Sequence, residues 1–314
     1  MIGPLLGFLG RRGTSFLAAG ILIGLALPRL AALLRPSLAP LVFLLATATM
    51  IRIDWPQVAA HVRQPVRVVL VLAWGLIVSP AAAALLTASL PLPPGLAHAI
   101  VIWSASPALI SAPALAFLLG LDGSLALIAM VAGSFLMPFS LPPLVLGLLG
   151  VRLDIGIAAL MGRLVLFIGG AVLLAALCRR LLRGRLARVA DEINGVNVLL
   201  LVLFAIGIMD GVPRIWATRP HELALYVASA FAAALGQQLL GTAAFLWSGR
   251  VPALTVGMIC GNRNMASVWA SLGALAPPEL TLFLVALQLP IYILPMLLRP
   301  LYLRMGAKLD GRAR

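Results

Sequence analysis

Long apolar runs, separated by short clusters of charged, proline and glycine residues, make up most of the chain. Most runs approach the roughly 20 residues that a helix needs to cross the hydrocarbon core of a bilayer. The pattern therefore predicts an all-α integral membrane protein with about ten transmembrane helices. The expected spans lie near residues 14–34, 38–53, 66–90, 95–119, 124–149, 155–178, 194–212, 221–247, 251–276 and 279–303.

The first two spans are the weakest part of this prediction. The apolar run of the second span, from Leu38 to Met50, is short, and the first span carries Pro28 and Arg29 near its end. A count of nine spans therefore stays open beside the count of ten.

Composition supports the membrane assignment. Of 314 residues, 62% are hydrophobic and only 10% are charged, and the mean hydropathy is +1.11. Soluble domains carry roughly a quarter charged residues. This composition excludes a soluble enzyme or a nucleic-acid-binding domain and leaves the bilayer as the main partner.

The formal net charge of +14 is best explained by topology, because the cations lie between the apolar runs. Cytoplasmic loops of membrane proteins collect Lys and Arg. A cytoplasmic N-terminus places fifteen cations inside and five outside, so we expect both termini in the cytoplasm of a bacterial inner membrane. The inside set is Arg11, Arg12, Arg52, Arg63, Arg67, Arg179, Arg180, Arg183, Arg185, Arg188, Arg250, Arg304, Lys308, Arg312 and Arg314, and the outside set is Arg29, Arg35, Arg152, Arg214 and Arg219.

Ten spans divide into two repeats of five. Because each repeat has an odd number of spans, the second repeat crosses the membrane in the opposite orientation to the first. We expect the repeat boundary near residues 150–155. Residues 1–184 then hold the first repeat, the sixth span and a basic cytoplasmic linker, and residues 185–314 hold the remaining spans. Inverted repeats of this kind place a binding site at the membrane midplane, between discontinuous helices in corresponding positions.

The fourth and ninth spans, which correspond under a five-span repeat, both carry helix-breaking residues. Pro107 and Pro113 lie six residues apart in the fourth span, and each removes a backbone donor. In the ninth span, Gly257 and Gly261 precede a polar run. We expect unwound backbone at both places, with the two breaks crossing at the midplane.

The polar run of the ninth span contains an arginine, Arg263, between Asn262 and Asn264. An arginine at a helix centre in the membrane costs about 2.5–3.5 kcal/mol even on a lenient insertion scale. One hypothesis is that Arg263 faces a polar cavity and meets an anionic substrate. The other, which does not exclude the first, is that its donors satisfy carbonyl groups freed where the broken helices cross.

Other polar side chains of the apolar spans complete the candidate substrate site. Ser267 and Ser271 continue one helical face from Asn264, and Gln237 and Gln238 either line the same cavity or form interhelical hydrogen bonds. The full candidate set is Asn262, Arg263, Asn264, Ser267, Ser271, Ser106, Ser111, Gln237 and Gln238, with helix breaks at Pro107, Pro113, Gly257 and Gly261.

Motifs of enzyme chemistry are absent from the sequence. It contains no glycine-rich phosphate loop, no HExxH and no GxSxG. The two cysteines, Cys178 and Cys260, lie in separate apolar spans without CxxC spacing. We expect no enzymatic activity, no cofactor and no metal.

Several segments, in this order and spacing, resemble the bile acid:sodium symporter family over most of the chain. They are MIRIDWPQVAAHVRQPV at 50–66, Ser79-Pro80, the proline-rich fourth span, residues 134–143, and GNRNMA at 261–266. The resemblance implies a ten-span fold in which a core domain (spans 3–5 and 8–10) moves against a panel domain (spans 1, 2, 6 and 7) in alternating access. It also implies organic-anion substrates.

The chain departs from this family where the family binds sodium. Ala112-Pro113 stands at the Ser-Asn pair of the fourth span, and Gly133 and Met137 replace hydroxyl residues of the fifth. Ile259 stands for the carboxylate and Arg263 for the glutamine of the ninth span, and Gly75 for the third-span glutamine. Hard cations need several oxygen ligands, so this joint loss predicts that both sodium sites are absent.

These observations predict a monomeric, alternating-access secondary transporter of a small organic anion that is not coupled to sodium. Two alternatives remain. The first is a sodium-dependent symporter in which other residues supply the sodium ligands. The second is a membrane sensor or assembly protein that keeps the fold but does not transport. Neither substrate identity nor transport direction follows from the sequence.

Overall fold

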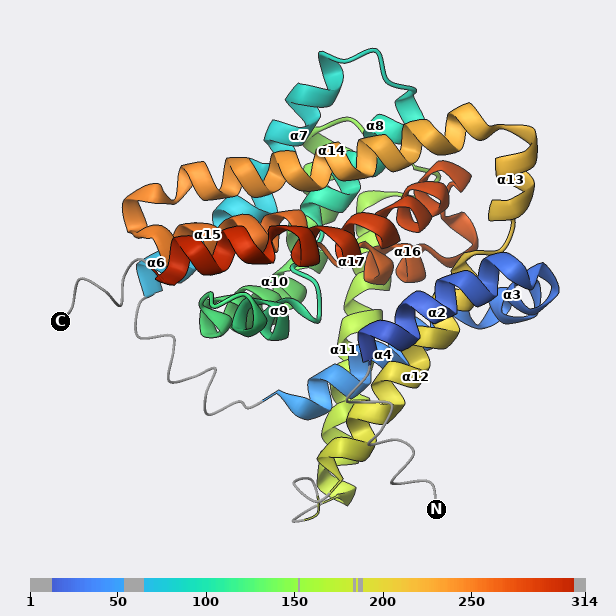
Figure 1. Ribbon diagram of the computed structural model, residues 1–314, viewed down its shortest axis with the longest axis horizontal. Coiled ribbons are helices and arrows are strands. Elements are labelled where there is room, and N and C mark those ends of the chain that lie inside the picture. Colours follow the sequence, from blue (N-terminus) through green and yellow to red (C-terminus); the bar gives the residue numbers. More distant parts are fainter. Residues whose placement is uncertain (1–12, 54–64, 152, 183–184, 186–188, 308–314) are drawn as a thin grey trace. The chain divides into compact units, whose positions relative to one another are not determined.

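The computed structural model describes residues 13–53, 65–151, 153–182, 185 and 189–307, with only the backbone at 13–18, 148 and 191. Most of these residues lie in helices, and none of them forms a strand (Figure 1). Seven of the helices are long and apolar enough to cross a membrane. The protein is therefore an all-α, multi-pass membrane protein.

The expected orientation in the membrane rests partly on residues that lie outside the described ranges. Nine of the expected loop cations fall there, as do residues 54–64 of the segment 50–66 that contributes to the family resemblance. The cations are Arg11, Arg12, Arg63, Arg152, Arg183, Arg188, Lys308, Arg312 and Arg314.

The chain divides into two compact units, and neither is continuous in sequence. The first unit comprises the described parts of Met1–Ile53, Val165–Ala224 and Trp269–Ala274, and the second those of Asp54–Leu164, Leu225–Val268 and Leu275–Arg314. The long helix α11 (Ile157–Leu181) contributes residues to both.

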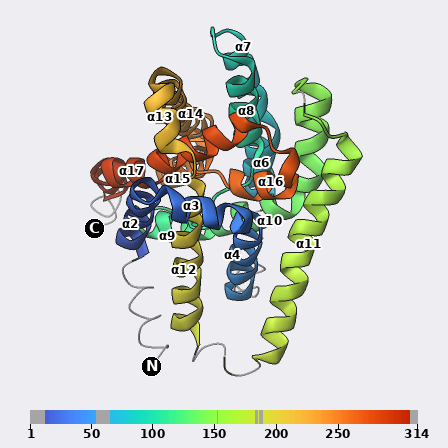
Figure 2. The same cartoon turned by 90° about the vertical axis from the view of Figure 1, so that its right-hand side faces the viewer.

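In the first unit, one helix packs between two others (Figure 2). The central helix is α12, and its neighbours α2 and α4 belong to the N-terminal part of the chain. The elements are α2 (Gly13–Ala26), α3 (Pro28–Leu34), η1 (Arg35–Ser37), α4 (Leu38–Arg52), α12 (Ala190–Ile208) and α13 (Val212–Thr218), together with α11 from Val165.

The contact between α2 and α12 is close because α2 presents glycines to it. A Cβ atom added to Gly24 would lie 2.6 Å from the Ile206 carbonyl oxygen, and one added to Gly20 would lie 3.2 Å from that of Val202. Small residues spaced four apart let two helix backbones approach within a membrane.

The boundary between the first two expected spans is wrong. The chain turns at Leu27, where α2 has ended, and residues 28–34 belong to the following helix, which runs as one candidate span from Pro28 to Arg52. Proline is favoured at the first turn of a helix, because the N–H that it lacks has no helical partner there. Pro28 therefore starts a helix, whereas we expected the first span to continue through it.

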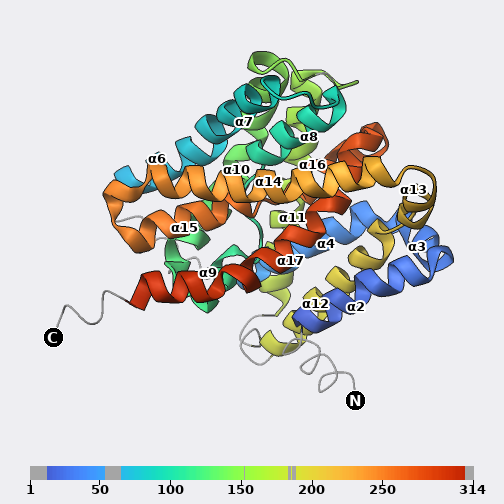
Figure 3. The same cartoon turned by 45° about the horizontal axis from the view of Figure 1, so that its top comes forward.

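The second unit contains two helices that stop partway and resume after a short extended segment. Helices α14 and α15 lie side by side in it (Figure 3). The elements are α6 (Pro65–Ala73), η2 (Trp74–Val78), α7 (Ser79–Ala88), α8 (Pro94–Ala105), α9 (Ala112–Leu118), α10 (Gly123–Pro142), η3 (Pro143–Leu148), α14 (Pro220–Ala244), η4 (Leu246–Ser248), α15 (Arg250–Gly261), α16 (Met265–Leu272) and α17 (Pro278–Ala307), with α14 from Leu225 and α16 to Val268. The turn η5 (Gly273–Leu275) is divided between the units, with only Leu275 in the second.

Gly257 is not a helix break. It lies inside α15, where an added Cβ atom would come within 2.5 Å of the Gln238 carbonyl oxygen on α14. At Gly261, the last residue of α15, an added Cβ would lie 2.6 Å from the Ala234 carbonyl oxygen. Both glycines therefore permit the close approach of α15 to α14.

We predict that Gly24→Ala lowers the thermal unfolding midpoint of the detergent-solubilised protein. The added methyl would meet the α12 backbone, and overpacking of this kind typically costs about 1–3 kcal/mol. Gly169→Ala on α11 is the matched control, because no atom lies within 4 Å of the added Cβ. Equal midpoints for the two variants would show that the α2–α12 contact is not tight.

Candidate functional site

The first helix break lies between α8 and α9. Helix α8 ends at Ala105, and Ser106 is extended, with φ −71° and ψ 155°. This is the conformation that a following proline favours, and Pro107 also has no N–H to continue the helix. The hydroxyl of Ser106 donates to the Ile102 carbonyl oxygen at 2.9 Å, which helps to cap the end of α8.

The second break lies between α15 and α16. Helix α15 ends at Gly261, and Asn262 leaves the helical conformation with φ −126° and ψ 87°. The side-chain amide of Asn262 donates to the Met258 carbonyl oxygen at 2.8 Å. Ser267, in the first turn of α16, donates to the Asn264 carbonyl oxygen at 2.9 Å.

The two breaks meet as a short antiparallel pair. Ala108 and Arg263 form an isolated β-bridge. The Leu109 amide donates to the Asn262 carbonyl oxygen, and the Asn264 amide donates to the Pro107 carbonyl oxygen, both at 2.8 Å. Each break thus supplies partners for backbone groups that the other exposes, as a non-aqueous environment requires.

Arg263 is the central side chain of this contact, and it is 4% exposed. Its Nε donates to the Cys260 carbonyl oxygen, its Nη1 to the carbonyl oxygens of Gly75 and Ser106, and its Nη2 to the Ser79 hydroxyl. All four distances are 3.0 Å. One guanidinium therefore joins α15, the end of α8, η2 and α7.

The carbonyl of Gly75 is available because of a proline five residues later. In the π-helical turn η2, the Ser79 amide donates to the Trp74 carbonyl oxygen, five residues back. The same pattern would pair Pro80 with Gly75, but proline has no N–H. Gly75 also leaves room for the guanidinium, since an added Cβ atom would lie 3.3 Å from Nη1 of Arg263.

Gln237 on α14 fixes the orientation of the Ser79 hydroxyl. Ser79 Oγ donates to Gln237 Oε1 at 2.7 Å, and Gln237 Nε2 donates to the Ser79 carbonyl oxygen at 3.2 Å. With its proton directed to Gln237, the hydroxyl oxygen is left to accept from Arg263. The buried chain Arg263–Ser79–Gln237 thus extends the site to α14.

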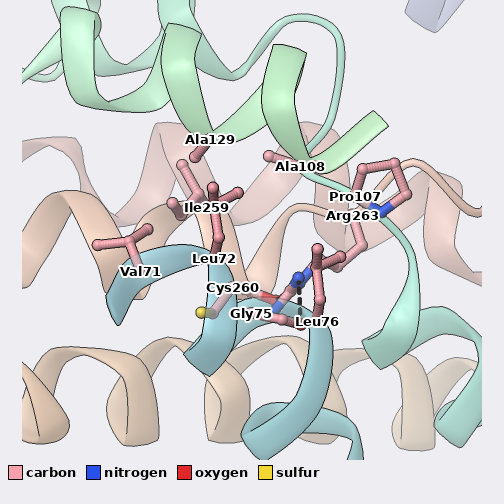
Figure 4. A pocket seen from close by; sticks show the side chains of 11 residues that line it. Val71, Leu72, Gly75, Leu76, Pro107, Ala108, Ala129, Ile259, Cys260 and Arg263 are labelled. Carbon is pink, nitrogen blue, oxygen red and sulfur yellow. Dashed lines mark hydrogen bonds between the residues drawn. The ribbon is translucent and has the colours of Figure 1, made fainter. Parts of the chain in front are cut away.

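A small pocket opens beside Arg263 (Figure 4). Its volume of about 20 Å³ is large enough for a water-sized group. Apart from Arg263 its lining is mainly aliphatic, and the residues are Val71, Leu72, Gly75, Leu76, Pro107, Ala108, Ala129, Gly133, Ile259, Cys260 and Arg263. Gly75, Gly133 and Ile259, three of the positions where the family resemblance implies sodium ligands, therefore lie here without a side-chain oxygen.

The structure does not bring every candidate residue to this contact. Ser111 is exposed at the start of α9, and Gln238 accepts a hydrogen bond from the Tyr302 hydroxyl at 2.8 Å. Ser271 is buried on α16 but is grouped with the first unit. Pro113 is not an interruption, because it lies in the first turn of α9, where a proline fits a helix.

Three partners of Arg263 were not among the candidate site residues: the carbonyls of Gly75 and Cys260 and the hydroxyl of Ser79. For Gly75 and Ser79 the sequence holds a local signal. Gly75 stands five residues before Pro80 within an apolar span, and Ser79 directly precedes that proline. Cys260 offers only a backbone group at the end of a helix, which any residue could supply.

The acceptors of Arg263 are all neutral. Arg35–Asp210 and Arg219–Glu222 are salt bridges between described residues, and no carboxylate of the described part of the chain pairs with Arg263. Two helices, α8 and α15, end at this contact, and their carbonyl ends favour a cation. The site thus holds a fixed positive charge without a carboxylate counter-ion among the described residues.

No protein-family model and no curated protein matches the chain. Its function must therefore be inferred from the arrangement of these residues.

We predict that Arg263→Ala strongly destabilises the protein and that Arg263→Lys does not restore it. The alanine leaves four acceptors without a donor, at about 1–3 kcal/mol for each buried group left unsatisfied. A lysine ammonium lacks the planar fork that bridges several oxygens. The measurement is the thermal midpoint in detergent, with Arg250→Ala, at the exposed start of α15, as control. An Arg263→Ala midpoint as high as that of the control would refute this role.

Proposed function

We propose that the protein is a secondary transporter that moves a small organic anion across the bacterial cytoplasmic membrane by alternating access. The observation that carries the proposal is Arg263, a buried cation held between two broken helices with no carboxylate partner among the described residues. Intramembrane ionisable residues are rare and mark substrate or ion pathways. A positive charge in such a place favours a negatively charged substrate.

We further propose that transport does not depend on sodium. A cation bound at the crossing would need the oxygens of Gly75, Ser79, Ser106 and Cys260, and each already accepts from Arg263. A guanidinium can hold these groups in place as a bound cation would, but it cannot dissociate. Coupling to a sodium gradient would thereby be lost.

The proposal includes ten spans in two inverted repeats, on the bile acid:sodium symporter-like fold that the resemblance implies. Seven long candidate spans support this count, and α2 and the broken pairs α8–α9 and α15–α16 would supply the three further crossings. The broken pairs are then the fourth and ninth spans. In this proposal the second unit corresponds to the core domain and the first to the panel domain.

Ligand screening tests the substrate class. We predict that one or more carboxylates, sulfonates or bile salts raise the thermal midpoint of the solubilised protein, because a ligand that binds the folded state stabilises it. The stabilising compound should then enter proteoliposomes at the same rate in sodium and in potassium. Uptake that rose steeply with sodium alone would reject sodium independence, and binding without uptake would favour a sensor.

The Arg263→Ala variant separates two roles of the arginine in this screen. Direct contact with the anion predicts that ligand-induced stabilisation falls more than basal stability. A purely structural role predicts that both fall together. A folded variant with unchanged ligand affinity and basal stability would contradict both roles.

Cysteine accessibility tests the topology. In a variant lacking Cys178 and Cys260, we predict that single cysteines at Arg185 and Gly306 both react with an impermeant maleimide from the cytoplasmic side only. Both positions follow an even number of spans when the N-terminus is cytoplasmic. Labelling from opposite sides of the membrane would exclude the ten-span arrangement.

A further inference from the structure

Among the groups that hold Arg263, none carries a formal negative charge. Three carbonyl oxygens and one hydroxyl accept its hydrogen bonds. Buried charges in proteins are normally paired. Within the described residues no carboxylate supplies that partner, so a counter-ion from solution would fill the role.

The pocket beside Arg263 offers room for such a counter-ion. Its volume of about 20 Å³ accommodates a water-sized group. Its aliphatic walls, which include Leu72, Ala129 and Ile259, offer no second charge. A monatomic anion fits this volume, and Arg263 supplies the charge that would bind it.

The guanidinium has more N–H donors than hydrogen bonds to protein oxygens. It has five N–H donors, and four hydrogen bonds go to protein oxygens. Arg263 itself lines the pocket, so the charged group borders the space that the anion would take.

We propose that a halide ion, chloride under physiological conditions, occupies this pocket as the counter-ion of Arg263. The inference rests on the proposed function only in treating Arg263 as an unneutralised cation, and it requires no transport. The halide would stabilise the contact between the two broken helices, and the organic substrate would be a separate ligand.

Two glycine-to-alanine variants test the site without touching Arg263. At Gly133 an added Cβ atom would lie 3.4 Å from Pro107 Cβ and 4.0 Å from Leu72 Cδ2, ordinary contact distances between residues that line the pocket. The methyl group therefore enters the pocket without a clash. Gly236→Ala makes the same change inside α14, where no atom lies within 4 Å of the added Cβ.

Equilibrium dialysis of the full-length, solubilised protein against radioactive chloride measures the binding directly. We expect saturable binding of about one chloride per chain by the wild type and by Gly236→Ala, and loss of this binding in Gly133→Ala. In parallel, replacing gluconate by chloride at constant ionic strength should raise the thermal midpoint of the first two proteins and not of the third. The basal midpoint of Gly133→Ala in gluconate should equal or exceed that of the wild type.

Absence of saturable chloride binding by the wild type would overturn the inference, as would undiminished binding by Gly133→Ala. Either result leaves the proposed function intact if organic-anion uptake persists. Conversely, chloride binding with the expected variant pattern but no uptake of any organic anion would reject transport and retain the halide site.

Discussion

The guanidinium of Arg263 holds together the centre of the second unit. Insertion of an arginine at mid-membrane costs about 2.5–3.5 kcal/mol, and each of its four acceptors would cost about 1–3 kcal/mol if it were buried without a donor. Each side of the interaction is unfavourable in the membrane without the other. Their mutual satisfaction explains how the chain can bury a charge here, where Arg263 is 4% exposed.

The two helix breaks are also explained by the need of buried polar groups for hydrogen-bond partners, in this case the backbone N–H and C=O groups. A proline alone does not produce a break, because α17 continues through Pro290, Pro295 and Pro300, whereas α8 ends just before Pro107. The difference is that the backbone freed near Pro107 meets the break of α15 and pairs with it. Unwound backbone is tolerated at membrane depth only where protein groups satisfy it, so each break depends on the other.

For a transporter, a tethered cation differs from a bound one in that it cannot leave. It keeps the contact between the breaks assembled in every state that preserves its four hydrogen bonds. Movement of the second unit as a rigid body would then be independent of cation binding. In the proposed transporter, this charge would also select the sign of the ligands that can approach.

The sequence by itself predicted the membrane class, most helices and the location of Arg263 at a helix break. These features depend on local properties: apolar length, the N–H that proline lacks, and the cost of a charge among apolar residues. It did not predict that Gly257 packs against α14, that Pro28 starts a helix, or that Ser111 is exposed. Only the tertiary structure decided which acceptors Arg263 would meet, since Gly75 and Ser79 lie 188 and 184 residues away along the chain. It likewise separated Gln237, which orients Ser79, from the adjacent Gln238, which binds Tyr302. Neighbouring residues of a helix point in different directions, and only the packing of distant helices determines which partner each one reaches.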